Sequence, residues 1–144
     1  MKRLATVLLV LAMVLGGAAV AAAPATAAAS CSASGCTGLD PQSMGCSPGA
    51  ITLESKEYNG VWMELRYNSD CYAAWTRYER ICCSTFIPPA TAYIRGSGHT
   101  YSKNLAGWVG EKGWTKMVSF EEYVRSCVMV YKDGGYVQDC TPEH

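Results

Sequence analysis

The stretch VWMELRYNSDCYAAWTRYE, residues 61 to 79, decides the fold of this chain. Residues 61 to 67 alternate between two sets of side chains, Val61, Met63, Leu65 and Tyr67 on one side and Trp62, Glu64 and Arg66 on the other. A period of two is that of a half-buried β-strand. Asn68-Ser69-Asp70 has the composition of a turn, so residues 71 to 79 are predicted to return as a second strand. The pattern predicts a β protein.

A loop, a short helix and further strands are predicted outside residues 61 to 79. Residues 96 to 113 hold five glycines and are predicted to be mostly loop. Ser119 with Glu122 fits a capping box, which predicts a short helix over residues 120 to 125. Further strands are expected at residues 50–54, 91–95 and 115–118. Together these elements predict one all-β domain, a small antiparallel sandwich or barrel, over residues 50–144.

The segment CVMVYKDGGYVQDC, residues 127 to 140, predicts a hairpin with a defined register. A two-residue turn at Asp133-Gly134 places Cys127 opposite Cys140 in a non-hydrogen-bonded pair, with Cα atoms about 4.5 Å apart. That separation suits a disulfide. A turn at Gly134-Gly135 would instead place Cys140 opposite Met129. We therefore predict a Cys127–Cys140 bridge that stabilises the fold by roughly 3 kcal/mol.

Residues 1–29 have the layout of a signal peptide. Lys2 and Arg3 form a positive start, an apolar run follows, and Ala27-Ala28-Ala29 offers a cleavage site. An uncleaved anchor is disfavoured because Pro24 ends the apolar run. A lipoprotein modified at Cys31 is disfavoured because Ala28 stands at the position where lipoprotein sites usually have leucine. The chain is expected to be secreted to the extracellular space and to leave the membrane after cleavage.

Residues 30–49 form a Cys-rich N-terminal arm that is predicted to be loop-like, because glycine, proline and cysteine dominate it. All eight cysteines follow residue 30, and exported thiols are normally oxidised. The six besides Cys127 and Cys140 allow fifteen pairings, which sequence does not resolve. Our preference joins Cys31 to Cys36 and Cys46 to Cys71, with the partners of Cys82 and Cys83 left open.

Metal binding and catalysis have little support. The spacing of Cys31, Cys36 and Cys46 resembles part of a zinc site, but no histidine or second C-x-x-C completes it, so no metal is expected. The two histidines, His99 and His144, stand in no recognisable triad. We expect no catalytic residue and no cofactor. A carboxylate pair remains a third-ranked option, with suspects Glu64, Asp70 and Glu79, although ion pairing of Glu64 with Arg66 or Arg77 on the solvent side is favoured.

Four stretches of the sequence stand out together, namely CSASGCTGLDPQSMGC, ELRYNSDCYAAWTRY, TKMV and a final CT. They resemble the DUF2690 family, which groups small secreted proteins common in actinobacteria. The resemblance implies secretion and a β-rich fold, and it brings no known activity or catalytic residues. Cys31, Cys36, Cys46 and Cys71 match the family's cysteines. The chain departs from the family with Asn68 for serine, Thr76 for alanine, and the added Cys82-Cys83 pair.

Composition gives the remaining functional expectations. Twelve basic and twelve acidic residues leave no net charge and no basic patch, so nucleic acid is not an expected partner. Nine tyrosines and four tryptophans against two phenylalanines favour rings with a polar handle, which suit binding surfaces. Trp62 and Trp75, if they are cross-strand neighbours, would make a platform for a glycan.

The sequence thus predicts a monomeric, non-catalytic module that binds a glycan or cell-envelope material, or less favourably a protein. The alternative is an inhibitor of proteases or other enzymes that presents the loop STFIPP, residues 84–89. Core packing of the tryptophans is the competing interpretation of the glycan platform.

Overall fold

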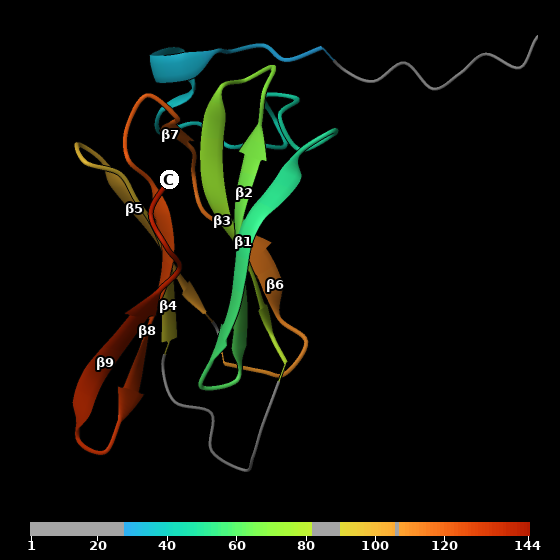
Figure 1. The fold of residues 1–144 in the computed structure, drawn as a ribbon. Coiled ribbons are helices and arrows are strands. Elements are labelled where there is room, and N and C mark those ends of the chain that lie inside the picture. Colours follow the sequence, from blue (N-terminus) through green and yellow to red (C-terminus); the bar gives the residue numbers. More distant parts are fainter. Residues whose placement is uncertain (1–27, 82–89, 106) are drawn as a thin grey trace, which may run out of the picture.

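The computed structural model describes residues 28–81, 90–105 and 107–144, and these form two antiparallel β-sheets (Figure 1). The described residues contain strands, turns and a single 3-10 turn but no α-helix. The all-β, disulfide-stabilised class predicted from the sequence is therefore confirmed. No helix in this part of the chain has the length and apolar character needed to cross a bilayer.

The first sheet, sheet A, is built around the β2–β3 pair. Its strand order is β1-β2-β3-β6, and the short β7 pairs with the end of β3 that β6 leaves uncovered. Its strands are β1 (Ile51–Tyr58), β2 (Val61–Asn68), β3 (Ala73–Arg80), β6 (Lys112–Trp114) and β7 (Val118–Ser119).

The second sheet, sheet B, has the order β5-β4-β8-β9, with every neighbouring pair antiparallel. Its strands are β4 (Ala90–Arg95), β5 (Thr100–Leu105), β8 (Arg125–Lys132) and β9 (Gly135–Cys140). Strands β2 and β3 contact β4 and β8, so the two sheets face each other as in a sandwich.

The alternation of β2 and β3 buries one face of sheet A against sheet B. Val61, Met63 and Leu65 have no solvent exposure. Val61 and Met63 pack in one cluster with Val128 and Val130 of β8. Burying a side chain of this size contributes about 1.5–3 kcal/mol, so this inner face is the main source of stability. The two sides assigned to residues 61 to 67 agree with the structure.

A polar contact between the two sheets crosses this core. Buried Thr76 on β3 donates its hydroxyl to the Tyr93 carbonyl and lies 2.7 Å from the Ser126 hydroxyl. Ser126 in turn donates to the Glu64 carbonyl at 3.1 Å. Buried hydroxyls require such partners. The residue that departs from the family pattern at position 76 therefore links the two sheets.

The β8–β9 hairpin has the register predicted from the sequence. Cys127 faces Cys140 and forms a disulfide with it, and Lys132 faces Gly135 at the closing pair. Asp133 and Gly134 have φ values of 51° and 85°. A type I′ turn needs positive φ at both central positions, which explains why Asp-Gly stands here.

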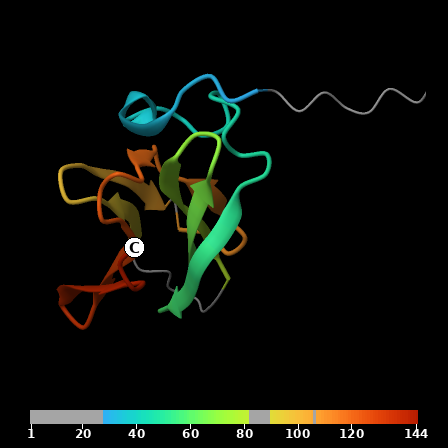
Figure 2. The ribbon, with the colours of Figure 1, turned by 45° about the horizontal axis from the view of Figure 1, so that its top comes forward.

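The N-terminal arm covers one end of the sandwich (Figure 2). Its single turn of 3-10 helix, η1, spans Ala33–Cys36. Disulfides Cys31–Cys36 and Cys46–Cys71 are present, which are the two pairings that we preferred. The buried sulfurs pack with Trp75 and Met117 into a cluster separate from the core between the sheets.

Asn68 fixes the arm to the β2–β3 turn. Its side-chain N–H groups donate to the Cys46 and Pro48 carbonyls at 2.8 Å each, and its carbonyl accepts the N–H groups of Asp70 and Cys71. A serine, the usual residue of the family here, has one hydroxyl and could not make all four bonds. This departure strengthens the attachment of the arm.

The prediction of loop over residues 96–113 is wrong in part, because β5 occupies Thr100–Leu105 and β6 begins at Lys112. Strand β5 lies at the edge of sheet B and most of its residues are exposed. An edge strand exposed on both faces has no apolar alternation, so the pattern that identifies half-buried strands was absent.

The strand expected at residues 115–118 is also interrupted. Pairing with β3 stops at Trp114 and resumes at Val118. Between them the Thr115 N–H still donates to the Thr76 carbonyl, but at Met117 the backbone bonds the arm instead. The Met117 N–H donates to the Leu39 carbonyl, and the Met117 carbonyl accepts the Gly38 N–H. Hydrogen bonding of this segment to the arm explains why its strand pairing with β3 is interrupted.

The predicted helix over residues 120 to 125 is wrong. Residues 120–122 form a turn, and β8 begins at Arg125. The Ser119 hydroxyl accepts the Glu121 N–H, while the Glu122 carboxylate binds the N–H groups of Gly98 and His99 in another loop. The capping box does not form because its glutamate has these long-range partners. Cys82, Cys83 and the loop at 84–89 lie outside the described residues, as do residues 1–27.

Candidate functional site

The outer face of sheet A, turned away from sheet B, carries an ordered array of aromatic and charged side chains. The register places them in three rows across the strands. The rows are Trp62, Glu79 and Lys112; Glu64, Arg77 and Trp114; and Arg66 with Trp75. A pocket of about 330 Å³ lies over this array, within the range of small-molecule sites. We call it the outer pocket.

Trp62 and Trp75, the two residues predicted to bind a ligand, both line the outer pocket. They are not cross-strand neighbours, because Trp62 faces Glu79 and Trp75 faces Arg66. Trp75 is only 3% exposed and packs under the arm, whereas Trp62 is half-buried. The core interpretation therefore holds for Trp75, and Trp62 keeps a free surface.

Trp114 is a pocket residue that the sequence analysis missed. It lies on β6, and its indole N–H donates to Asp40 Oδ2 at 2.8 Å. Asp40 Oδ1 also accepts the N–H groups of Gln42 and Ser43. Burial raises the pKa of Asp40, but these hydrogen bonds outweigh it and keep the pKa below its usual value. An ionised Asp40 thus anchors Trp114 to the arm.

The arm also supplies part of the pocket wall. Gln42 and Ser47 line it together with the strand residues. Because the Cys46–Cys71 bridge and Asn68 hold this part of the arm on the sheet, the pocket depends on the disulfide framework. Nothing local in the sequence around Trp114 indicated this, since residues 40 and 114 meet only in the folded chain.

Charges in the outer pocket are mostly paired. Arg77 and Glu64 form an ion pair with 2.5 Å between Nε and Oε2, and Lys112 lies 3.1 Å from Glu79. Arg66 differs, because it donates to two neutral oxygens, Thr52 Oγ1 at 2.5 Å and the Ala50 carbonyl at 2.6 Å. The Glu64 carboxylate bonds Arg77, and the hydrogen bonds of Arg66 involve no carboxylate.

The carboxylates considered for hydrolysis have other roles. Glu64 lies on the side of the strand expected for it, but it is only 9% exposed there; it pairs with Arg77, one of the two predicted partners. Glu79 pairs with Lys112. Asp70 lies in the β2–β3 turn, where Asn68 accepts its N–H. Glu64 and Glu79 are thus engaged in ion pairs across neighbouring strands.

His99 has a carboxylate partner that sequence did not reveal. Its Nδ1 contacts Glu122, and the same carboxylate accepts the N–H groups of Gly98 and His99. Burial raises the pKa of Glu122, but these hydrogen bonds lower it overall. Across residues 28–81, 90–105 and 107–144, no serine, threonine or cysteine side chain bonds His99. The contact ties two loops together.

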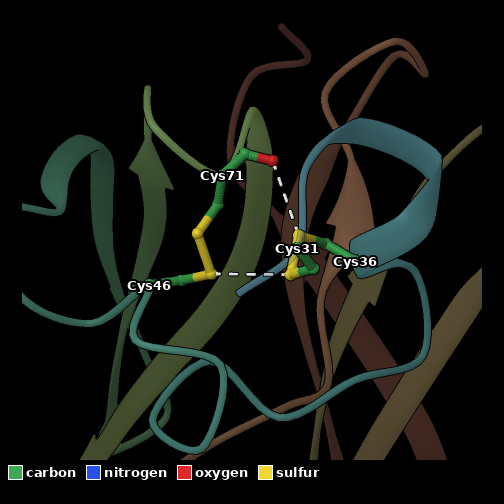
Figure 3. A group of neighbouring side chains, drawn as sticks. All are labelled: Cys31, Cys36, Cys46 and Cys71. Atoms are coloured by element: carbon green, nitrogen blue, oxygen red, sulfur yellow. Dashed lines mark hydrogen bonds between the residues drawn. A yellow bond between two sulfur atoms is a disulfide. The ribbon is translucent and has the colours of Figure 1, made fainter. Parts of the chain in front are cut away.

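Four cysteine sulfurs form a compact cluster beneath the arm (Figure 3). Those of Cys31, Cys36, Cys46 and Cys71 lie within 4.8 Å of one another, with 3.8 Å between Cys31 and Cys46. The folded chain thus provides the fourth sulfur that the sequence spacing lacked. Thiolates bind zinc, but here the four sulfurs are joined in two disulfides. The cluster could hold a metal only after both bridges were reduced.

The chain belongs to the DUF2690 family, described as proteins of unknown function, because the family model matches residues 34–135. This confirms the family resemblance seen in the sequence. No curated protein and no solved structure matches the chain. Function must therefore be argued from the outer pocket itself.

Proposed function

We propose that this member of the DUF2690 family is an exported, monomeric, non-catalytic module that binds a saccharide in the outer pocket. The single observation that carries the proposal is the composition of that pocket. Trp62 and Trp114 offer indole surfaces, and Gln42, Arg77 and Glu79 bring planar polar groups to the same space.

Saccharides need this combination. Their C–H faces pack on flat aromatic rings, and their hydroxyls exchange hydrogen bonds with amide, guanidinium and carboxylate groups. Trp62 and Trp114 stand on β2 and β6, separated by β3, so two strand spacings, roughly 10 Å, lie between them across the sheet, and an offset of two residues along the strands separates them further. This spacing favours an extended ligand that meets both rings, such as an oligosaccharide of the cell envelope.

Export and rigidity fit the same role. Three disulfides join described cysteines, and such bridges persist in oxidising compartments outside the cytosol. A pocket built on strands and on a bridged arm loses little conformational entropy when it binds. Glu64 and Glu79 are held in ion pairs and His99 contacts Glu122, an arrangement that favours binding without turnover.

The test is retention of the oxidised protein on insoluble saccharides, namely peptidoglycan, chitin, cellulose and cross-linked polygalacturonate. We expect the wild type to be retained on at least one of them. Trp62→Ala should abolish retention, because it removes a ring from the pocket wall.

Trp108→Ala is the matched control, since Trp108 is 61% exposed and does not line the outer pocket. It should bind like the wild type. Equal retention of both variants, or no retention of the wild type on any of the four matrices, would contradict the proposal. Melting curves of each variant show whether the fold is intact.

A further inference from the structure

Arg66 stands apart from the other cations of the outer pocket. Arg77 has the Glu64 carboxylate and Lys112 has that of Glu79. The hydrogen bonds of Arg66 go to the Thr52 hydroxyl and the Ala50 carbonyl, which are neutral. Among the described side chains, none forms an ion pair with it. The charges of these three cations and two carboxylates sum to +1.

The two hydrogen bonds of Arg66 leave other donors of its guanidinium for a ligand. A guanidinium has five N–H donors, and the bonds to Thr52 and Ala50 use one donor on each of its two terminal nitrogens. Those contacts also fix the side chain against β1, so it is held in place before a ligand arrives. Arg66 lines the outer pocket beside Trp75, which faces it across the β2–β3 pair.

The surroundings of Arg66 are unfavourable to a lone cation. Burial lowers its pKa, and repulsion from Arg77 lowers it further, while Glu64 acts in the opposite sense. A half-buried cation whose hydrogen-bond partners are neutral gains strongly from an added anion, because a charge-assisted hydrogen bond is about twice as strong as a neutral one. Carboxylate and phosphate oxygens match the guanidinium fork.

We infer that the saccharide bound in the outer pocket carries an anionic group, a carboxylate or a phosphate, and that Arg66 binds this group. The inference rests on the function proposed above and specifies the class of its ligand. Neutral glycans would meet the tryptophans but leave Arg66 without a counter-ion. Uronic-acid and phosphate-bearing envelope polymers supply both features.

The experiment compares acidic saccharides with their own neutral forms. The probes are soluble oligogalacturonate, hyaluronate fragments and wall teichoic acid. Each carboxylate probe is paired with its carboxyl-reduced product, and teichoic acid is paired with its dephosphorylated repeat unit. Binding to the oxidised full chain is measured by calorimetry at two salt concentrations. We expect at least one acidic probe to bind about ten- to a hundredfold more tightly than its neutral form, as one or two charge-assisted bonds predict.

Variants assign the preference to Arg66. Arg66→Gln should bind acidic and neutral forms alike, and Arg66→Lys should keep part of the preference. Lys132→Gln, which removes a positive charge at the β8–β9 turn, should leave the preference unchanged. Comparison of the carboxylate probes with the teichoic acid probe identifies which anion is recognised.

Two failures are distinguishable. If neutral forms bind as tightly as acidic ones, or if Arg66→Gln keeps the full preference, the inference about the anion is wrong while saccharide binding stands. If no probe binds in either form and no matrix retains the protein, the proposed function is wrong as well. Unfolded Arg66→Gln, detected by its melting curve, is replaced in the comparison by Arg66→Lys.

Discussion

The two faces of the β2–β3 pair differ in what covers them. The inner face lies against sheet B, and Val61, Met63 and Leu65 there are fully buried. The outer face is covered by the arm at one end and otherwise carries the outer pocket. The same two strands thus stabilise the fold with one set of alternating residues and present candidate ligand contacts with the other. Substitutions on the two faces should separate stability from binding.

The largest effect on stability is expected at Met63. Met63→Ala removes a fully buried side chain from the cluster between the sheets and should lower the free energy of unfolding by about 2–5 kcal/mol. Urea unfolding measures this loss. The protein that remains folded should bind saccharide like the wild type. Weakened binding at unchanged stability would break the division between the faces.

The next effect concerns the arm. Replacing Cys46 and Cys71 together with alanine removes the bridge that ties the arm to the sheet and should cost about 3 kcal/mol. Binding should also weaken, because Gln42 and Trp114 lose their support. The matched control removes Cys127 and Cys140 together, with a similar stability loss and normal binding. If both double variants bind equally well, the arm does not shape the pocket.

Asp40→Ala sharpens the comparison further. It removes the acceptor that orients the Trp114 indole, so saccharide affinity should fall about tenfold while the free energy of unfolding falls by about 1 kcal/mol. Calorimetry measures the change in affinity, and urea unfolding measures the change in the free energy of unfolding. The reverse ranking, a large stability loss with unchanged affinity, would assign Asp40 to the fold alone.

The smallest effect is a pH dependence at the edges of the sheets. Lys56 on β1 binds Asp139 on β9 at 2.8 Å. The hydrogen bond from Lys56, helped by the Cys140 N–H, lowers the pKa of Asp139 below its ordinary 3.8 despite burial. A carboxyl with a depressed folded pKa stabilises the fold above its unfolded pKa, and this contribution is lost as the pH falls through the folded value.

Asp139→Asn should therefore reduce the free energy of unfolding slightly above pH 4 and flatten its decline at lower pH. Urea unfolding from pH 2 to pH 6 records both. Parallel curves for the variant and the wild type would show that the ion pair contributes nothing at this position.

The parts of the fold that could be predicted are those set by local patterns. The alternation of residues 61 to 67 assigned the inner and outer faces, and the Asp133-Gly134 turn fixed the Cys127–Cys140 pairing. Strand β5 was missed because an exposed edge has no alternation. The helix over residues 120 to 125 failed because Glu122 binds a distant loop.

The site was predictable only in part, for the same reason. Trp62 was found from its residue type and its side of the strand. Trp114 and Asp40 lie 74 residues apart, and the sulfur cluster of Figure 3 draws on Cys31 and Cys71. Such contacts arise from tertiary packing, which no local pattern encodes. Which charged side chains of the pocket pair with one another likewise depends on the register of β2, β3 and β6.

The claim that the outer face of sheet A is a binding surface is tested most directly by the indole N–H resonances of the four tryptophans. The ¹⁵N-labelled, oxidised protein would be titrated with oligogalacturonate and with teichoic acid fragments. The account predicts that the signals of Trp62 and Trp114 shift with increasing ligand and that the signal of Trp108 does not. Shifts of Trp108 alone, or of no tryptophan with either ligand, would contradict it.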